Sequence, residues 1–433
     1  MLSRLITYVV TLLSVLWLFC TMVASSVAAP VAAGTTAGAG GGNENGFTVP
    51  VMTLPRSGLS AKQLALIINE RDPLSVQIGY YYQQSRDIPL QNVVRVRFDP
   101  YQSEMQPGFF VVMQKRIEAL LPEGIEAYAL AWSSPYKVGC MSMTSAFAFG
   151  YQQDYCIGGC KPTRSSEYFR STTLKPYSDL GIRPAMMLAA RNIKEAEQLI
   201  DRGIAADGSW PSARALLVET PDKARSVRKV YFPLVEQQLG ERIEVVSRKG
   251  RDVEDQRGLM FYFTGDRVVK HIDSNQFFAG AMADHLTSSG GQLTDSSQMS
   301  AMRWLEGGAT GSYGTVVEPC NHLGKFPNPV LAMGDYLKGA TLLEAYWKSV
   351  EMPGQGVFIG EPLASPYRAY RLQWLGDSWL LWSPVLTPGR YKLLAADHAG
   401  GAYYTVHPSL LVKDDQAVEL MPPIRPFYRL ERL

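Results

Sequence analysis

The chain has 433 residues, 46% of them hydrophobic, which is long enough to bury a large core without depending on disulfides or metals. Its 42 Lys and Arg residues against 40 Asp and Glu residues leave a formal net charge of +2 at pH 7. No basic run interleaved with aromatic residues occurs in the sequence, so nucleic acid is not expected as a partner.

The first stretch of the chain, residues 1–28, is predicted to be a cleavable secretory signal peptide. Arg4 supplies a positive charge, residues 6–18 are mostly apolar, and residues 26–28 (Ser-Val-Ala) provide the small residues that signal peptidase needs. A retained membrane anchor is the alternative, but Thr and Ser residues interrupt the apolar stretch. We therefore expect an exported protein, periplasmic or extracellular, with no membrane span after cleavage.

After a Gly- and Ala-rich tether at residues 29–46, strands and helices alternate along an α/β domain predicted over residues 47–368. Strands are predicted at 64–69, 92–98, 125–132, 185–189, 215–219, 243–247, 258–264, 309–317 and 357–362. Helices are predicted at 73–86, 109–121, 193–202, 222–239, 296–306 and 341–350. This alternation predicts a mostly parallel, doubly wound sheet covered on both faces.

A long insertion at about residues 133–183 interrupts the alternation and is rich in polar and turn residues. Insertions of this size in compact domains often form lids or binding loops. The mature chain has four cysteines, Cys140, Cys156, Cys160 and Cys320, three of which lie in the insertion. An even number of cysteines in an oxidising compartment predicts disulfides, with three pairings open. A zinc site completed by His322 is the alternative, but the spacing is loose, so no metal and no cofactor are predicted.

Polar side chains gather in two segments near predicted strand ends. Glu318, Cys320, Asn321 and His322 follow the strand at 309–317, and a second segment contains Asp284, His285, Thr287 and Ser288. Ligands of open α/β sheets bind beyond the carboxyl ends of the strands. The sequence therefore predicts a candidate cleft lined by Asp284, His285, Glu318, Asn321 and His322. Glu361 is a further strand-end acid for which the sequence indicates no partner.

The last part of the chain, residues 369–433, changes to short strands separated by turns, which predicts a small antiparallel, sandwich-like β module. Its aromatic residues are Trp374, Trp379, Trp382, Tyr403 and Tyr404. Burial in the core of the module is the first interpretation of these side chains, and stacking on sugars is the second.

Four segments resemble an uncharacterised family of exported bacterial proteins. They are YYYQQSRDIPLQNV at 80–93, GAMADHLTSSGG at 280–291, GATGSYGTVVEPCNHLGKFPNP at 308–329 and EAYWKSV at 344–350. The resemblance covers most of residues 47–367 and implies export, without implying an activity.

The order of the closing elements also resembles the caspase and gingipain-like cysteine peptidase fold. That resemblance implies a His and a Cys at the ends of successive central strands, the Cys in a segment corresponding to residues 283–291. This chain has Asp284 and His285 there but no cysteine, and the region of the expected His reads Thr-Gly-Asp at 264–266. The resemblance supports the fold and argues against a peptidase.

Three functions remain open. The first is a binding or structural exoprotein, which needs no activated nucleophile and is the function we favour. The second is a hydrolase in which Cys320 attacks, His285 or His322 acts as base, and Glu318 or Asp284 orients the base. The third is a metal-dependent hydrolase that assembles Asp284, His285, Glu318 and His322. In each case Asn321, Thr287 and Ser288 are candidate binding residues, and the sequence leaves open whether the protein is an enzyme.

Overall fold

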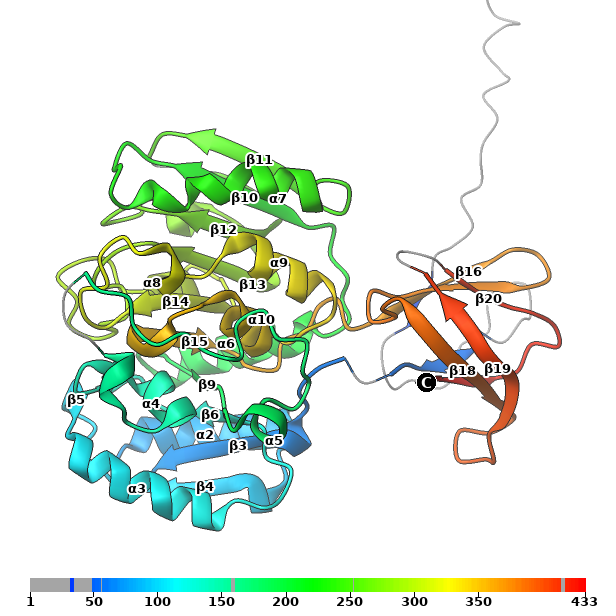
Figure 1. Cartoon of the computed structure of the whole chain (residues 1–433), viewed down its shortest axis with the longest axis horizontal. Helices are drawn as coiled ribbons and strands as arrows, with labels where there is room; N and C mark the ends of the chain where they lie inside the picture. The colour runs from blue at the N-terminus through cyan, green and yellow to red at the C-terminus, as the bar shows by residue number, and fades with distance from the viewer. Residues whose placement is uncertain (1–31, 35–48, 56, 157–159, 252, 414–416) are drawn as a thin grey trace, which may run out of the picture.

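The structure is a computed structural model that describes residues 32–34, 49–55, 57–156, 160–251, 253–413 and 417–433. The predicted signal peptide lies outside these residues, as does most of the tether. Figure 1 shows an α/β domain beside a smaller β-sandwich. Within the described residues, no helix is both long and apolar enough to cross a membrane.

A ten-stranded sheet forms the centre of the α/β domain. Its order is β11 (Glu244–Lys249), β10 (Arg214–Glu219), β12 (Leu259–Thr264), β13 (Phe277–His285), β14 (Gly311–Thr315), β15 (Gly356–Gly360), β9 (Ala185–Met187), β6 (Ala127–Leu130), β3 (Leu64–Asn69) and β4 (Val93–Val96). Neighbours from β11 to β14 are parallel, and so are neighbours from β9 to β4. β15 runs antiparallel to β14 and meets β9 at Ile359 and Met187. The predicted mixed α/β class with a mostly parallel sheet is confirmed.

Helices cover both faces of the sheet. They are α2 (Pro73–Ser85), α3 (Pro107–Leu120), α4 (Met143–Phe149), α5 (Pro176–Leu180), α6 (Ile193–Ala206), α7 (Phe232–Leu239), α8 (Met302–Glu306), α9 (Pro329–Leu337) and α10 (Leu342–Ser349). Successive residues of β3 point to opposite faces, so Leu64 and Leu66 enter one buried cluster while Ala65 and Ile67 enter another. This two-sided burial explains why β3 reads as a continuous apolar run.

The helix predicted at 296–306 is much shorter in the structure, because α8 begins only at Met302. The hydroxyls of Ser296 and Ser300 donate instead to the backbone carbonyls of Ser289 and Leu293, which holds this segment as a loop. The helix predicted at 222–239 is a 3₁₀ segment, Ser226–Tyr231, followed by α7. Pro233 fits at the start of α7, since its missing N–H has no partner within a helix at that position.

Part of the predicted insertion belongs to the core. The short strands β7 (Lys137–Val138) and β8 (Met141–Ser142) lead into α4, whose Phe147 packs edge-on against Phe110 and Tyr128. Two disulfides hold the region: Cys140 with Cys156, and Cys160 with Cys320. The prediction of disulfides is confirmed, and the second one joins the insertion to the segment after β14.

The sandwich has two four-stranded sheets with a core of their own. One contains β1 (Ala32–Gly34), β16 (Tyr370–Trp374), β17 (Trp379–Trp382) and β20 (Val418–Leu420), and the other contains β19 (Tyr404–Val412), β18 (Gly389–Ala396), β21 (Phe427–Arg432) and β2 (Val51–Thr53). β2 pairs in parallel with β21, so this strand lies in the sandwich although the sequence assigned it to the α/β domain. β1, from within the predicted tether, pairs with β16.

Candidate functional site

The strand-end segment predicted from the sequence begins with Asp284, which is buried with 1% of its surface exposed. Its carboxylate Oδ1 lies 2.5 Å from Nη1 of Arg228, which is also buried. Burial raises the pKa of Asp284 to about 6, while the charge of Arg228 and its hydrogen bond to the carboxylate act in the opposite direction. Asp284 therefore belongs to an internal ion pair that fixes the 3₁₀ segment before α7 against the end of β13.

His285, the last residue of β13, is equally buried, and both of its ring nitrogens are occupied. Nδ1 accepts a hydrogen bond of 3.0 Å from Nε1 of Trp304. Because the indole can only donate, the ring proton lies on Nε2, which donates to the carbonyl of Met299 at 3.1 Å. Burial lowers the pKa of His285 to about 3. The imidazole is thus a neutral structural link between β13 and the region of α8.

Thr287 lies beyond the end of β13 within a hydrogen-bonded cluster. Its hydroxyl accepts from Nε of Arg225 at 3.0 Å and donates to Gln298. Arg225 in turn forms an ion pair of 2.8 Å with Asp222. The neighbouring Ser288 accepts a hydrogen bond through its backbone carbonyl. This edge of the sheet is therefore closed by contacts among its own side chains.

The segment after β14 has a different environment. Glu318 and Asn321 are exposed, and His322 is half-buried. Oε1 of Glu318 accepts from the backbone N–H of Cys320 at 2.8 Å, which closes a local turn. Cys320 has a φ of 52° and is joined to Cys160, so it carries no free thiol in this structure.

Among the described residues, no hydrogen bond or ion pair joins the two predicted segments. Asp284 and His285 are interior, and their hydrogen bonds and ion pairs go to other residues, whereas Glu318, Asn321 and His322 lie nearer the surface. Among the described residues, no group of three or more His, Cys, Asp or Glu side chains is placed to hold a metal ion. The structure therefore shows no common geometry for the triad or the metal set considered from the sequence.

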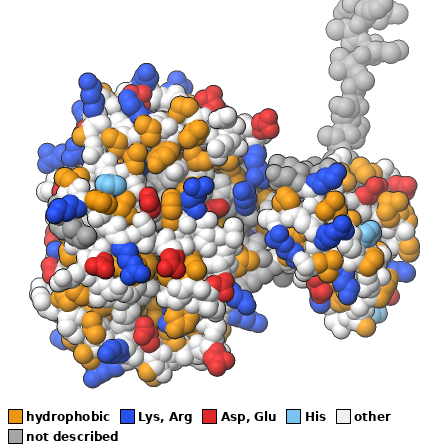
Figure 2. All heavy atoms as spheres, in the orientation of Figure 1, with side chains coloured by type: hydrophobic (Ala, Val, Ile, Leu, Met, Phe, Trp, Pro, Cys, Tyr) orange, Lys and Arg blue, Asp and Glu red, His pale blue; other side chains and the backbone are white. Residues whose placement is uncertain are grey.

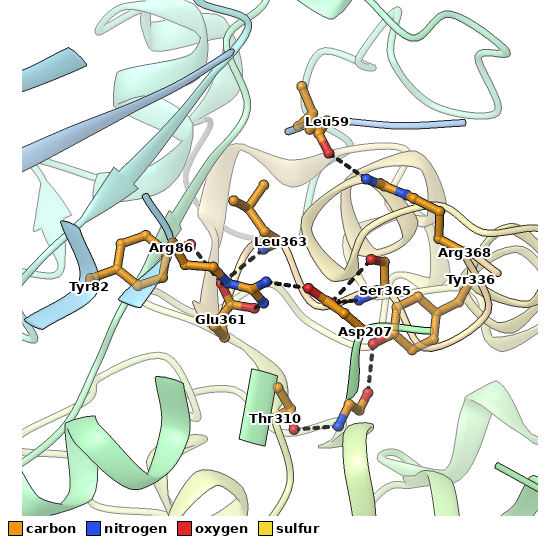
Figure 3. A network of polar contacts seen from close by, with 11 residues as sticks. Leu59, Tyr82, Arg86, Asp207, Thr310, Tyr336, Glu361, Leu363, Ser365 and Arg368 are labelled. Atoms are coloured by element: carbon orange, nitrogen blue, oxygen red, sulfur yellow. Dashed lines mark hydrogen bonds and ion pairs between the residues drawn. The ribbon is translucent and has the colours of Figure 1, made fainter. Parts of the chain in front are cut away.

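Glu361, the acid without an apparent partner, is the centre of a buried network (Figure 3). It accepts from the hydroxyl of Tyr82 at 2.6 Å and from Nε and Nη2 of Arg86 at 3.1 and 2.6 Å. Arg86 also forms an ion pair with Asp207. Burial acts to lower the pKa of Arg86, but Glu361, Tyr82 and Asp207 raise it above its ordinary value. Two carboxylates and one guanidinium thus join α2, the end of α6 and the end of β15.

The network continues into the loop that leads from the α/β domain to the sandwich (Figure 3). Oδ1 of Asp207 accepts from the backbone N–H and the hydroxyl of Ser365 at 3.0 and 3.2 Å. The backbone N–H of Trp210 donates to the carbonyl of Pro366 at 3.1 Å, and Nη1 of Arg368 donates to the carbonyl of Leu59 at 2.8 Å. The loops that contain Trp210 and Pro366 are therefore held together where the two parts of the molecule meet.

A pocket of about 640 Å³ opens at this junction. Residues of the α/β domain, the connecting loop and the sandwich line it together, among them Trp210, Arg242, Tyr367, Arg371 and Trp382. The sequence interpretation placed the aromatic residues of the module in its core, and Trp379 does lie there. Trp382 is three residues further along β17 and points to the opposite face, which the alternation of the strand would have indicated.

No protein-family model and no curated protein matches the sequence. Among solved structures, the complex of the pro- and mature domains of RgpB from Porphyromonas gingivalis is similar to 84% of this chain and 94% of that chain, with 10% identity and a TM-score of 0.44. A structure described as a protease is similar to 87% of this chain and 98% of that chain, with 9% identity and a TM-score of 0.37. At this identity and TM-score, the two structures support no statement about activity or ligands. The resemblance to exported bacterial proteins stays a prediction.

Proposed function

We propose that this protein is a non-catalytic binding exoprotein that uses the α/β domain as a rigid scaffold. The observation that supports this most directly is the state of the two residues best suited to acyl transfer. His285 has both ring nitrogens engaged in the interior, and Cys320 is half of a disulfide. A nucleophile and a base must lie within hydrogen-bond reach of each other and of a substrate. The two disulfides also support export, because such bonds persist in oxidising compartments.

The test is to release the thiol of Cys320 on purpose. A Cys160→Ala variant leaves Cys320 unpaired, and a Cys160→Ala/Cys320→Ala variant is its matched control. Each is assayed on casein and on p-nitrophenyl esters beside the unreduced protein, whose free thiols are counted by alkylation and mass spectrometry. We expect no alkylated Cys320 in the native protein and no hydrolysis by any of the three.

Hydrolysis that appears on releasing Cys320 and disappears in the double variant would contradict the proposal. It would establish the cysteine hydrolase instead, with the disulfide blocking the thiol of Cys320. Hydrolysis by all three proteins that a chelator abolishes would indicate the metal-dependent alternative.

A further inference from the structure

The outer face of one sandwich sheet carries an arginine and a tryptophan side by side. Arg371 on β16 and Trp382 on β17 are direct cross-strand partners in an antiparallel pair. Their neighbours in sequence, Tyr370, Leu372 and Leu381, point into the core of the sandwich, so these two side chains point away from it. The sandwich thus presents this pair of side chains towards the α/β domain.

Trp210 completes this surface from the α/β side. Its ring centroid lies 4.7 Å from that of Trp382, and the guanidinium carbon of Arg371 lies 4.6 Å from the centroid of Trp210. Trp210 has a left-handed backbone with a φ of 51°, and its backbone N–H donates to the carbonyl of Pro366 at 3.1 Å. A strained residue of this kind persists only where its surroundings fix it. We call Trp210, Arg371 and Trp382 the junction platform.

Arg371 is the charged member of the platform, and among the described residues no carboxylate forms an ion pair or hydrogen bond with it. Burial lowers its pKa, so the guanidinium gains from an anion that enters the pocket. Glu244 also lines the pocket, but its carboxylate is bound by Nε and Nη2 of Arg214 at 2.9 and 2.8 Å. Figure 2 shows Lys and Arg side chains on both parts of the molecule beside their junction. Glu241 and Arg242 also line the pocket, so the wall carries both signs of charge, and Arg371 is the group with which an anionic ligand would pair.

We propose that the junction platform binds an acidic oligosaccharide, a chain of sugar rings that carry carboxylates. The apolar faces of sugar rings pack on tryptophan rings, and a guanidinium pairs with a carboxylate through two parallel hydrogen bonds. Ser212 on the pocket wall is a polar residue that can meet a hydroxyl group of such a ligand. A volume of about 640 Å³ lies within the range of small-ligand sites. This inference rests on the proposed binding function and names its ligand class.

Three probes of similar length separate the parts of the proposal: hexagalacturonate has rings and carboxylates, cellohexaose has rings without charge, and hexaglutamate has carboxylates without sugar rings. Binding to the full mature protein is measured by isothermal titration calorimetry at low salt. We expect hexagalacturonate to bind roughly tenfold or more tightly than either control, because a charge-assisted pair and ring stacking both contribute. Equal binding of cellohexaose or tighter binding of hexaglutamate overturns the proposal, as does the absence of binding by hexagalacturonate.

Substitutions then locate the site. Arg371→Gln and Trp382→Leu are expected to weaken hexagalacturonate binding roughly tenfold each. The matched control is Arg429→Gln, because Arg429 is on β21 of the other sheet, outside the pocket, with its guanidinium carbon 4.1 Å from the centroid of the Tyr403 ring. The melting temperature of each variant is recorded as well. If the platform only packs the two parts together, Arg371→Gln and Trp382→Leu lower the melting temperature and leave the affinity of the folded protein unchanged.

Release of reducing ends from hexagalacturonate is followed in the same samples. Cleavage would contradict the non-catalytic function and leave the binding site in place. If hexagalacturonate neither binds nor is cleaved, the proposed ligand class is wrong, and the proposal of a non-catalytic protein is unaffected.

Discussion

The imidazole of His285 is held neutral by two hydrogen bonds and complete burial, and this makes the stability of the fold depend on pH. The pKa of this group is about 3 in the folded protein and about 6.5 in an unfolded chain. Between these values only the unfolded chain takes up the proton. The contribution of His285 is therefore complete above about pH 6.5 and is lost as the pH falls towards 3.

We predict that lowering the pH from 7 to 4.5 costs the native protein about 2–3 kcal/mol more than it costs a His285→Gln variant. Urea unfolding at both pH values measures this difference. Asp284 has the opposite sign, since its folded pKa of about 6 lies above the value of about 3.9 in an unfolded chain, so its contribution is lost as the pH rises. Asp284 is present in both proteins and cancels in the comparison. Equal pH dependence of the two proteins would show that His285 is protonated or exposed in the fold.

Residue-scale chemistry was the part that the sequence predicted least well. The rule that ligands bind at strand ends singled out Asp284 and His285, but their partners Arg228, Met299 and Trp304 come from other elements. Nothing local to residues 284–285 distinguishes a reactive side chain from one that is satisfied in the core. Burial and partners arise only when the elements pack, so the sequence alone could not separate the buried, bonded side chains from the exposed ones.

At the scale of elements, β14 lies unusually close to the turn that follows β13. A Cβ added at Gly314 would lie 2.4 Å from backbone atoms of Gly290 and Gly291, a distance that real side chains do not reach. Gly334 in α9 offers the contrast, because a Cβ there would meet no atom within 4 Å. Both residues are glycines in regular elements of the same domain, and only one is required by its surroundings.

We predict opposite effects for alanine at these two positions. Gly314→Ala forces the backbone segments apart and is expected to destabilise the protein by about 3 kcal/mol or more. Gly334→Ala lowers the entropy of the unfolded chain and favours the helix, so it is expected to stabilise by about 0.4–1 kcal/mol. Thermal unfolding of both variants beside the native protein tests this, and a loss of stability at Gly334 would contradict the assignment of free space there.

Elements with a strong hydrophobic pattern were predictable, and β3 has the same bounds in the structure as in the prediction. For β13 the sequence indicated a strand end near residues 284–291 but no strand bounds, although β13 lies near the middle of the sheet. Its central residues, Gly280, Ala281 and Ala283, have little β propensity of their own. The strand bulges at Gly280, whose φ is 89°, and its regular pairing with β12 begins at Met282, which also pairs with β14. That pairing information lies outside the segment.

At the scale of the whole molecule, the two disulfides close loops of very different length. Cys140 and Cys156 are 16 residues apart, whereas Cys160 and Cys320 are 160 residues apart. A cross-link removes more freedom from the unfolded chain when it closes a longer loop, about 5 kcal/mol for the long one and about 3 kcal/mol for the short one. The longer link also joins the insertion to the segment after β14.

We therefore predict that Cys160→Ser/Cys320→Ser lowers the free energy of unfolding by about 2 kcal/mol more than Cys140→Ser/Cys156→Ser does. Guanidinium unfolding of both double variants without reductant provides the comparison, with the reduced native protein as a reference for the loss of both bonds. A larger loss for the short loop would mean that native contacts around Cys140, and not chain entropy, dominate.

The pairing of β2 with β21 makes the sandwich a domain interrupted by another domain. The chain contributes β2, builds the α/β domain, and returns to the sandwich at β16, and a hydrogen bond of 2.8 Å joins Leu59 and Arg368 where it leaves and re-enters. During synthesis, β2 is made well before its partner strand β21 (Phe427–Arg432), so the two can pair only after β21 has been made. The junction platform draws its residues from both domains, so a truncated chain that folds its α/β domain still lacks the completed sandwich. The sandwich can therefore form its complete sheet only after β21 has been synthesised.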